Sequence, residues 1–166
     1  MMKTFKFRNG DTVEAIGLGT WKSDPGKVGS AVETALKTGY RHIDCAAVYG
    51  NETEVGDALS ETFSTTEIKR EKVHITSKLW NTAHRKQDVI PALKKSLKDL
   101  RLNYLDLYLM HWPVAFKPGL EGFPQGEQDY LSLDEVPLIE TWEAMLEAKK
   151  QGLIRHAGVS NFSIEK

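Results

Sequence analysis

The sequence predicts an α/β fold built on a parallel sheet, and three observations predict it. Short apolar segments with strand character alternate along the chain with segments whose apolar residues recur at helical spacing. Residues 105–110 form a nearly continuous apolar run, which is typical of a strand buried on both faces of a parallel sheet. Ionisable side chains also follow the ends of successive strands, as they do at the carboxyl rim of such a sheet.

The chain is expected to open with a hairpin. Strands at 4–8 and 11–15 flank Asn9 and Gly10, a pair typical of a tight primed turn in which both residues adopt positive φ. A brief strand at 16–19 follows. The helix after it ends before Gly39, and its apolar face consists of Val28, Ala31, Val32, Ala35 and Leu36.

The same alternation of strand and helix then repeats to the end of the chain. We expect a strand at 40–44, a helix at 52–63, a strand at 73–79, a helix with Ile90, Leu93, Leu97 and Leu100 on one face, a strand at 105–110, a helix begun by Ile139, Trp142 and Met145 after a Gly/Pro-rich loop, and a strand at 153–159.

A parallel sheet of this kind forms either an open doubly wound layer or a closed barrel. Residues 17–22 begin like a dinucleotide fingerprint, but Lys22 stands where the third glycine belongs, and no acidic residue follows in the required register. Because ionisable residues gather at the ends of several successive strands, we predict a barrel.

Composition excludes several classes of partner. The chain has 22 basic and 23 acidic side chains and no basic run, so we expect neither nucleic acid nor a membrane as a partner. The five histidines lack paired metal-ligand spacing, so we predict no metal site. The single cysteine, Cys45, is interpreted as a packing residue and fits a reducing compartment; the first ten residues do not resemble a signal peptide, and we expect a cytoplasmic protein.

Four ionisable residues are candidates for chemistry: Asp44, Tyr49, Lys78 and His111. Each has a structural explanation when taken alone: Asp44 as a strand-end cap, Tyr49 as a packing residue, Lys78 as a solvated strand end and His111 as a core histidine. Taken together, Asp44, Lys78 and His111 lie at the ends of three successive predicted strands, so they should meet at one rim.

The charges of this group suit protonation of a developing alkoxide. A free tyrosine has a pKa of about 10, and a nearby ammonium favours its phenolate form. We expect Lys78 to act in this way on Tyr49, with Asp44 holding Lys78 charged and oriented. His111 would donate a hydrogen bond to a substrate oxygen.

Aromatic residues accompany these rim positions. Trp21, Trp80 and Trp112 follow successive strands, and Phe123 lies on the long loop. Tryptophan is seldom fully buried, so these side chains are better placed to line a cleft than to fill a core. An aromatic cleft implies a substrate with substantial apolar surface.

Long, ordered motifs in the chain resemble those of the aldo-keto reductase family, and of its aldose and aldehyde reductases in particular. The motifs are residues 17–21 (GLGTW), 39–44 (GYRHID), 49–56 (YGNETEVG), 77–80 (SKLW), 104–113 (YLDLYLMHWP) and 158–162 (GVSNF). The resemblance implies a TIM-type (β/α)8 barrel, of which residues 1–166 supply one incomplete domain with the hairpin and about the first five strands.

The resemblance also implies an activity and a set of site residues. The activity is NADPH-dependent reduction of aldehydes or ketones to alcohols, with Tyr49 as general acid, Lys78 and Asp44 tuning it, and His111 orienting the carbonyl. On the cofactor side the matching positions are Gly19, Thr20, Trp21, Asp44, Ser160 and Asn161. Those of the substrate pocket are Trp21, Val48, Trp80, His111, Trp112 and Phe123.

A complete barrel of this type needs roughly 250 residues, so we expect this chain to be a partial sequence or a truncated product. Residues 163–166 look like the start of another helix. An unclosed sheet exposes an edge that favours self-association. Two other functions remain open: a half-barrel that oligomerises or binds NADPH without catalysis, and an aldolase that uses Lys78 as a Schiff-base nucleophile.

Overall fold

The computed structural model describes residues 3–120 and 122–164. Its elements are β1 (Thr4–Lys6), β2 (Thr12–Glu14), β3 (Leu18–Gly19), α1 (Val28–Lys37), β4 (His42–Asp44), the short 3-10 helix η1 (Ala47–Tyr49), α2 (Glu52–Thr65), η2 (Arg70–Lys72), β5 (His74–Leu79), η3 (Asn81–Ala83), α3 (Lys86–Asp99), β6 (Leu105–Met110), β7 (Ala115–Phe116), η4 (Glu127–Asp129), β8 (Tyr130–Leu131), α4 (Leu138–Lys150) and β9 (Ile154–Val159). The predicted helix start at 163–166 falls partly on residues 165 and 166, which lie outside the described ranges.

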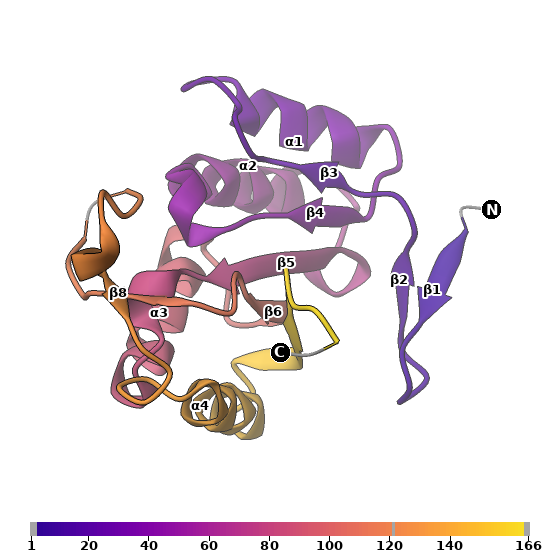
Figure 1. Cartoon of the computed structure of the whole chain (residues 1–166). Helices are drawn as coiled ribbons and strands as arrows, with labels where there is room; N and C mark the ends of the chain where they lie inside the picture. Colours follow the sequence, from indigo (N-terminus) through magenta and orange to yellow (C-terminus); the bar gives the residue numbers. More distant parts are fainter. Residues whose placement is uncertain (1–2, 121, 165–166) are drawn as a thin grey trace.

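Five strands form one parallel sheet in the order β3-β4-β5-β6-β9 (Figure 1). The order follows the chain, as it does when each crossover helix returns the chain to the next position of a growing barrel wall. The predicted alternation of strands and helices on a parallel sheet is therefore confirmed.

The hairpin lies where the sheet's strands begin, and the loop that carries β7 and β8 lies at the opposite end (Figure 1). Phe7, in the hairpin, stacks on His156 with ring centroids 4.4 Å apart. It also lies 6.1 Å from the ring of His74, the first residue of β5. The end of the sheet that carries the predicted chemistry is thus away from the hairpin.

The predicted turn of the hairpin is wrong in detail. The register pairs Lys6 with Thr12, and the backbone N–H of Phe7 donates to the carbonyl of Asp11, so the loop between them has three residues. Only Gly10 has a positive φ, +97°, and Asn9 does not. A type I turn followed by one left-handed residue is the usual way to close a three-residue loop, and it needs glycine only at the last position.

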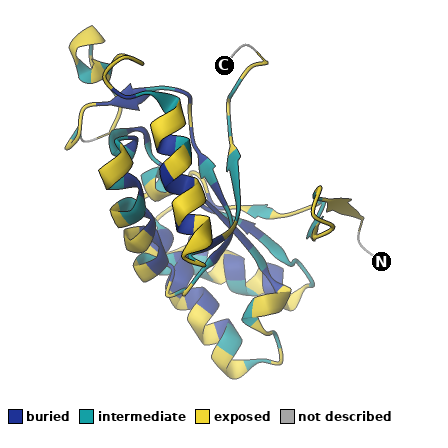
Figure 2. Ribbon diagram, turned by 90° about the horizontal axis from the view of Figure 1, so that it is seen from below, coloured by how far each residue is buried: buried dark blue, intermediate teal, exposed yellow. Residues whose placement is uncertain are grey.

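The helices bury one face against the sheet, and the core lies between these two layers (Figure 2). Ala31, predicted on the apolar face of the helix that is now α1, is exposed. Ile139, predicted near the start of α4, is exposed as well. In α4 the buried face is made by Thr141, Met145 and Ala148. Their spacing places Ile139 on the outer side of the helix.

The prediction that β6 is buried on both faces is only partly correct. Tyr108 and Met110 are buried, whereas Leu107 and Leu109 are intermediate. Leu109 pairs with Lys78 in register, so Leu107 and Leu109 share the face of the sheet that Lys78 occupies. In the described part of the chain, this interior face is less covered than the face packed on the helices.

No helix in the described ranges combines the length and apolar character needed to cross a membrane.

Candidate active site

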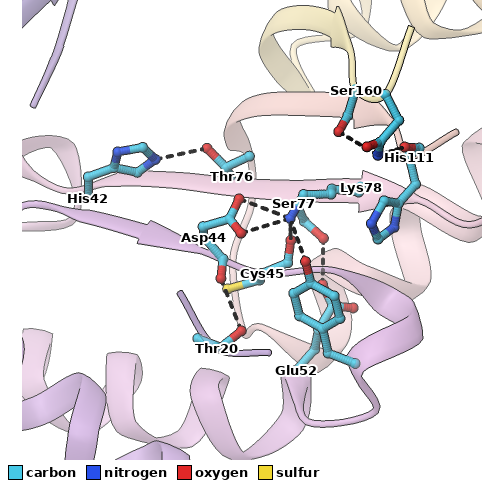
Figure 3. A network of polar contacts seen from close by, with 12 residues as sticks. Thr20, His42, Asp44, Cys45, Glu52, Thr76, Ser77, Lys78, His111 and Ser160 are labelled. Atoms are coloured by element: carbon cyan, nitrogen blue, oxygen red, sulfur yellow. Dashed lines mark hydrogen bonds and ion pairs between the residues drawn. The ribbon is translucent and has the colours of Figure 1, made fainter. Parts of the chain in front are cut away.

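The carboxyl ends of neighbouring strands bring the predicted ionisable residues together (Figure 3). Asp44 ends β4, Lys78 is the penultimate residue of β5, and His111 follows β6. Tyr49 reaches the same place from η1, the single turn between β4 and α2. The structure thus gathers all four residues at one rim.

The Lys78 ammonium is the centre of this group. It is 6% exposed and donates to both carboxylate oxygens of Asp44, at 2.9 and 2.8 Å, and to the backbone carbonyl of Cys45 at 2.9 Å. A nearly buried cation needs such an anionic partner, because burial without one would be costly. The Asp44 carboxylate therefore fixes the orientation of the Lys78 side chain and balances its charge.

Tyr49 contacts the same ammonium. Lys78 Nζ donates to the phenolic oxygen over 3.1 Å, and it lies 4.9 Å from the centre of the ring. Since the phenolic oxygen accepts this hydrogen bond, its own proton remains available to donate to another group. The arrangement stabilises the negative charge that the oxygen would carry after giving up that proton.

His111 is a neutral imidazole at the edge of the group. Burial and the Lys78 ammonium lower its pKa to about 4, so the ring is uncharged at neutral pH. Its ring lies edge-on to Tyr49, with centroids 5.9 Å apart, and to Trp80 at 5.4 Å. Nδ1 is buried and has no hydrogen-bond partner among the described residues. A neutral imidazole carries one N–H, which suits donation to a substrate oxygen.

Tyr49, Lys78 and His111 face a cleft of about 460 Å³. Its walls contain Trp21, Val48, Tyr49, Lys78, Trp80, His111, Trp112, Phe123, Ser160 and Asn161. Trp21 and Phe123 are more than 60% exposed, and the rings of Trp80 and Phe123 meet edge to face at 5.4 Å. A ligand with apolar surface could therefore bury these aromatic side chains when it binds.

Three predicted cofactor-side residues do not line this cleft: Gly19, Thr20 and Asp44. Thr20 is buried, and its hydroxyl donates to the Asp44 carbonyl at 3.0 Å, so it holds the end of β4. Gly19 is the last residue of β3 and pairs with Asp44 in register. No atom lies within 4 Å of the point where a side chain on Gly19 would begin, which leaves its backbone open to a ligand.

Ser160 and Asn161 follow β9 and line the cleft. The Asn161 amide donates to the His111 carbonyl at 2.8 Å and to the Ser160 hydroxyl at 3.1 Å. Asn161 has a φ of +61°, a left-handed conformation that asparagine tolerates better than most residues. Its side chain ties the loop after β9 to the residue that follows β6.

Glu52 belongs to the surroundings of the site but was not predicted. Its side chain is 4% exposed and accepts hydrogen bonds from Ser77 and Ser96. Burial raises the pKa of its carboxyl group, which the two serine hydrogen bonds partly offset. The sequence gives little signal for this, because an acidic residue in a first helical turn is ordinarily explained by the helix dipole.

Cys45 is fully buried, and desolvation raises the pKa of its thiol, which suits a packing residue. Among the residues that the structure describes, no group of three or more His, Cys, Asp or Glu side chains could hold a metal ion.

Comparison with known proteins extends these observations. Residues 15–166 match the model of the aldo/keto reductase family. An aldo/keto reductase of Synechocystis is 53% identical over 165 residues, which cover 99% of this chain and 50% of that protein. Aldo-keto reductase family 1 member A1 of Bos taurus is 53% identical over 93% of this chain and 48% of its own length.

Solved structures agree. The aldose reductase of Schistosoma japonicum superposes with a TM-score of 0.92 at 50% identity, covering 99% of this chain and 55% of that one. The aldose reductase of Giardia lamblia gives a TM-score of 0.84 at 48% identity. The sheet described above is therefore part of a TIM-barrel architecture, and the chain spans about half the length of the curated relatives it matches.

Proposed function

Because this chain belongs to the aldo/keto reductase family, we propose that it carries the proton-donating half of a site that reduces aldehydes and ketones to alcohols with NADPH. The cofactor supplies the hydride, that is, both electrons, to the carbonyl carbon. The residues of this chain supply the proton, the orientation of the carbonyl group and the walls of the cleft.

The observation that carries this proposal is the contact of the Lys78 ammonium with both Tyr49 and Asp44 at the cleft. Tyr49 would give its proton to the carbonyl oxygen while the carbon is reduced, and the phenolate left behind would lie 3.1 Å from Nζ of Lys78. The neutral ring of His111 would donate to the same carbonyl oxygen and fix its position. Solvent would then return a proton to Tyr49.

The nicotinamide end of the cofactor fits the described residues. The Ser160 hydroxyl and the Asn161 amide lie in the wall of the cleft, and a hydroxyl and an amide are suitable partners for a carboxamide. The open backbone at Gly19 and the exposed ring of Trp21 lie on the β3 side of the same rim. Preference for NADPH over NADH rests on the family.

The aromatic walls indicate which substrates to test. Trp80, Trp112 and Phe123 give the cleft an apolar surface, so we propose small carbonyl compounds with an aromatic or aliphatic body. The single buried thiol fits a reducing compartment such as the cytoplasm.

The geometry opposes the aldolase alternative. A Schiff-base lysine must attack as a neutral amine, whereas the Lys78 ammonium donates to Asp44, Tyr49 and the Cys45 carbonyl at once. We expect borohydride to trap no carbonyl substrate on Lys78. A Lys78→Met variant gives the background level of trapping.

The test of the proposed function mixes NADPH and an aromatic aldehyde with two proteins. One is the 166-residue chain, and the other, called the joined protein below, continues from Lys166 into the second half of the Synechocystis relative. Turnover by the joined protein, measured as cofactor oxidation and alcohol formation, is the expected result. A joined protein that folds and binds NADPH but reduces no aldehyde would overturn the proposal. Turnover by the 166-residue chain alone would mean that self-association completes the site.

A further inference from the structure

Glu52 is a buried carboxyl group that the proposed reaction does not use. Its two oxygens accept from different elements, Oε1 from the Ser77 hydroxyl of β5 at 2.6 Å and Oε2 from the Ser96 hydroxyl of α3 at 2.8 Å. Both serines are at most 1% exposed. Among the described residues, Glu52 forms no ion pair, and the two serine hydroxyls are the hydrogen-bond partners of its carboxyl group.

Glu52 lies close to Tyr49 in the chain and is bonded to the neighbour of Lys78. It is the first residue of α2 and follows Tyr49 by three residues, with Gly50 in the left-handed conformation between them. Ser77 is the neighbour of Lys78 in β5. The bond between Glu52 and Ser77 therefore joins the short segment that carries the phenol to the strand that carries the ammonium (Figure 3).

Glu52 acts from the opposite side of the sheet. Neighbouring residues of a strand point to opposite faces, so Ser77 points toward the helices while Lys78 points to the rim and the cleft. The register agrees, because Ser77 pairs with the fully buried Tyr108 and Lys78 pairs with Leu109. The carboxyl group of Glu52 does not line the cleft and so cannot touch a substrate bound there.

The segment that carries Tyr49 has few other attachments. Among the described residues, Lys78 forms the only hydrogen bond to the phenolic oxygen. Asn51 donates from its side chain to the Thr20 carbonyl at 2.8 Å, which ties the segment to the end of β3 but not to β5. On the side before Tyr49, the backbone N–H of Cys45 donates to the Thr76 carbonyl of β5 at 2.8 Å. On the side after Tyr49, the hydrogen bond from Ser77 to Glu52 attaches the segment to the strand of Lys78.

We propose that Glu52, through its hydrogen bond from Ser77, is a positioning residue that sets the distance between the Tyr49 phenol and the Lys78 ammonium. This inference rests on the proposed function for its catalytic consequence, but the distance itself can be tested without turnover. A displacement of about 1 Å in a reacting group can lower a rate by about 10²-fold, so a single hydrogen bond at this place can matter to catalysis.

The structure offers a matched pair of variants. Ser77→Ala and Ser96→Ala each remove one buried serine hydroxyl that donates to the same carboxyl group. Each should therefore lower stability to a similar degree. Only Ser77 is the neighbour of Lys78, so we expect Ser77→Ala in the joined protein to lower kcat at least about tenfold with little change in KM. Ser96→Ala should keep kcat within about twofold.

A second measurement does not need turnover. Crystal structures of the folded variants give the distance between the Tyr49 phenolic oxygen and Nζ of Lys78, which is 3.1 Å in the parent chain. Ser77→Ala should lengthen this distance by on the order of 1 Å, and Ser96→Ala should leave it unchanged. If Ser77→Ala fails to fold, Glu52→Gln, which keeps the size of the side chain, is compared with Glu52→Ala and should stay closer to the parent distance.

The outcomes separate the two proposals. Equal losses of kcat and equal distances between Tyr49 and Lys78 in Ser77→Ala and Ser96→Ala would overturn the positioning role, because the serines would then contribute only stability. A parent protein without turnover would count against the proposed function, and the distance between Tyr49 and Lys78 in the variants would still decide the role of Glu52.

Discussion

At the scale of single residues, the candidate site depends on one buried ammonium that has an anionic partner and a phenolic partner. Lys78 would lose its orientation without Asp44, and Tyr49 would lose the charge that stabilises its phenolate without Lys78. His111 contributes in the opposite way, because burial beside this cation keeps its ring neutral. The proposed proton transfer therefore requires all of these groups at one place.

Replacement of Lys78 tests the central cation. Lys78→Met keeps an unbranched side chain of similar length and removes the charge beside Tyr49. We expect kcat of the joined protein to fall by about 10²–10⁴-fold, the usual contribution of a positioned general acid. Steady-state kinetics measures the change, and circular dichroism checks that the fold persists. Unchanged kcat in the folded variant would show that the ammonium has no part in proton transfer.

Buried His84 gives a pH-dependent prediction. Burial lowers its pKa to about 4 from the usual 6.5, and its ring nitrogens have no partners among the described residues. The unfolded chain therefore binds more protons than the folded chain between pH 6.5 and 4, so stability falls as the pH is lowered through this window.

For His84 alone, the free energy of unfolding should fall by about 2 kcal/mol between pH 7 and pH 5. His84→Gln removes the titration but keeps the backbone carbonyl that accepts from Thr141. Denaturant unfolding measures the free energy of unfolding of both proteins at pH 7 and pH 5. We expect it to fall less in the variant than in the parent, and the difference should be about that amount. An identical loss in parent and variant would mean that His84 does not titrate in this way.

The sequence predicted the places of site residues correctly where strand ends carry ionisable side chains. Asp44, Lys78 and His111 could be placed at one rim because parallel strands end at the same edge. Glu52 could not be found in this way, because its burial depends on Ser77 and Ser96, which lie far away in sequence. A contact between distant residues leaves no local pattern.

At the scale of elements, helix packing makes a clear distinction between two glycines. Gly56 lies in α2, where a Cβ would meet the backbone carbonyl of Asp99 and lie 2.7 Å from the Leu100 Cα. Gly29 lies in α1, where the nearest atom to a Cβ is 3.5 Å away on Glu54. The close approach of α2 to the end of α3 therefore requires glycine, and the position in α1 does not.

Alanine at the two positions should have opposite effects. Gly29→Ala should stabilise the chain by about 0.5–1 kcal/mol, because alanine favours a helix. Gly56→Ala gains the same propensity but forces two backbones apart, and we expect a net loss of about 1–3 kcal/mol or more. Denaturant unfolding of both variants measures the difference. Equal changes in stability would contradict the packing described here.

Element prediction was most successful for long periodic segments. The helices α1, α2, α3 and α4 and the strands β5, β6 and β9 could be located because each has an apolar pattern that extends over at least six residues. β7 and β8 were missed, since each has two residues and they pair across a loop without a period of its own. The hairpin was located, but the length of its loop depends on which strand residues pair, and the Asn-Gly signal does not determine that.

At the scale of the whole molecule, the sheet is covered by helices on one face and carries the candidate site at one rim. Leu107 and Leu109, on the face shared with Lys78, remain partly exposed in the described structure. The chain spans about half of each relative it matches, while the four candidate proton-transfer residues all lie within it. We therefore propose that this chain donates the proton and that other parts of the barrel contribute to cofactor binding.

The most direct test of that claim compares two tyrosines in the joined protein. Tyr49→Phe removes the proposed acid, and Tyr108→Phe removes a buried hydroxyl that has no partner among the described residues. We predict that Tyr49→Phe lowers kcat for an aromatic aldehyde by about 10²–10⁴-fold while NADPH still binds, and that Tyr108→Phe leaves kcat within about twofold. Retention of kcat by a folded Tyr49→Phe protein that binds NADPH would contradict the account.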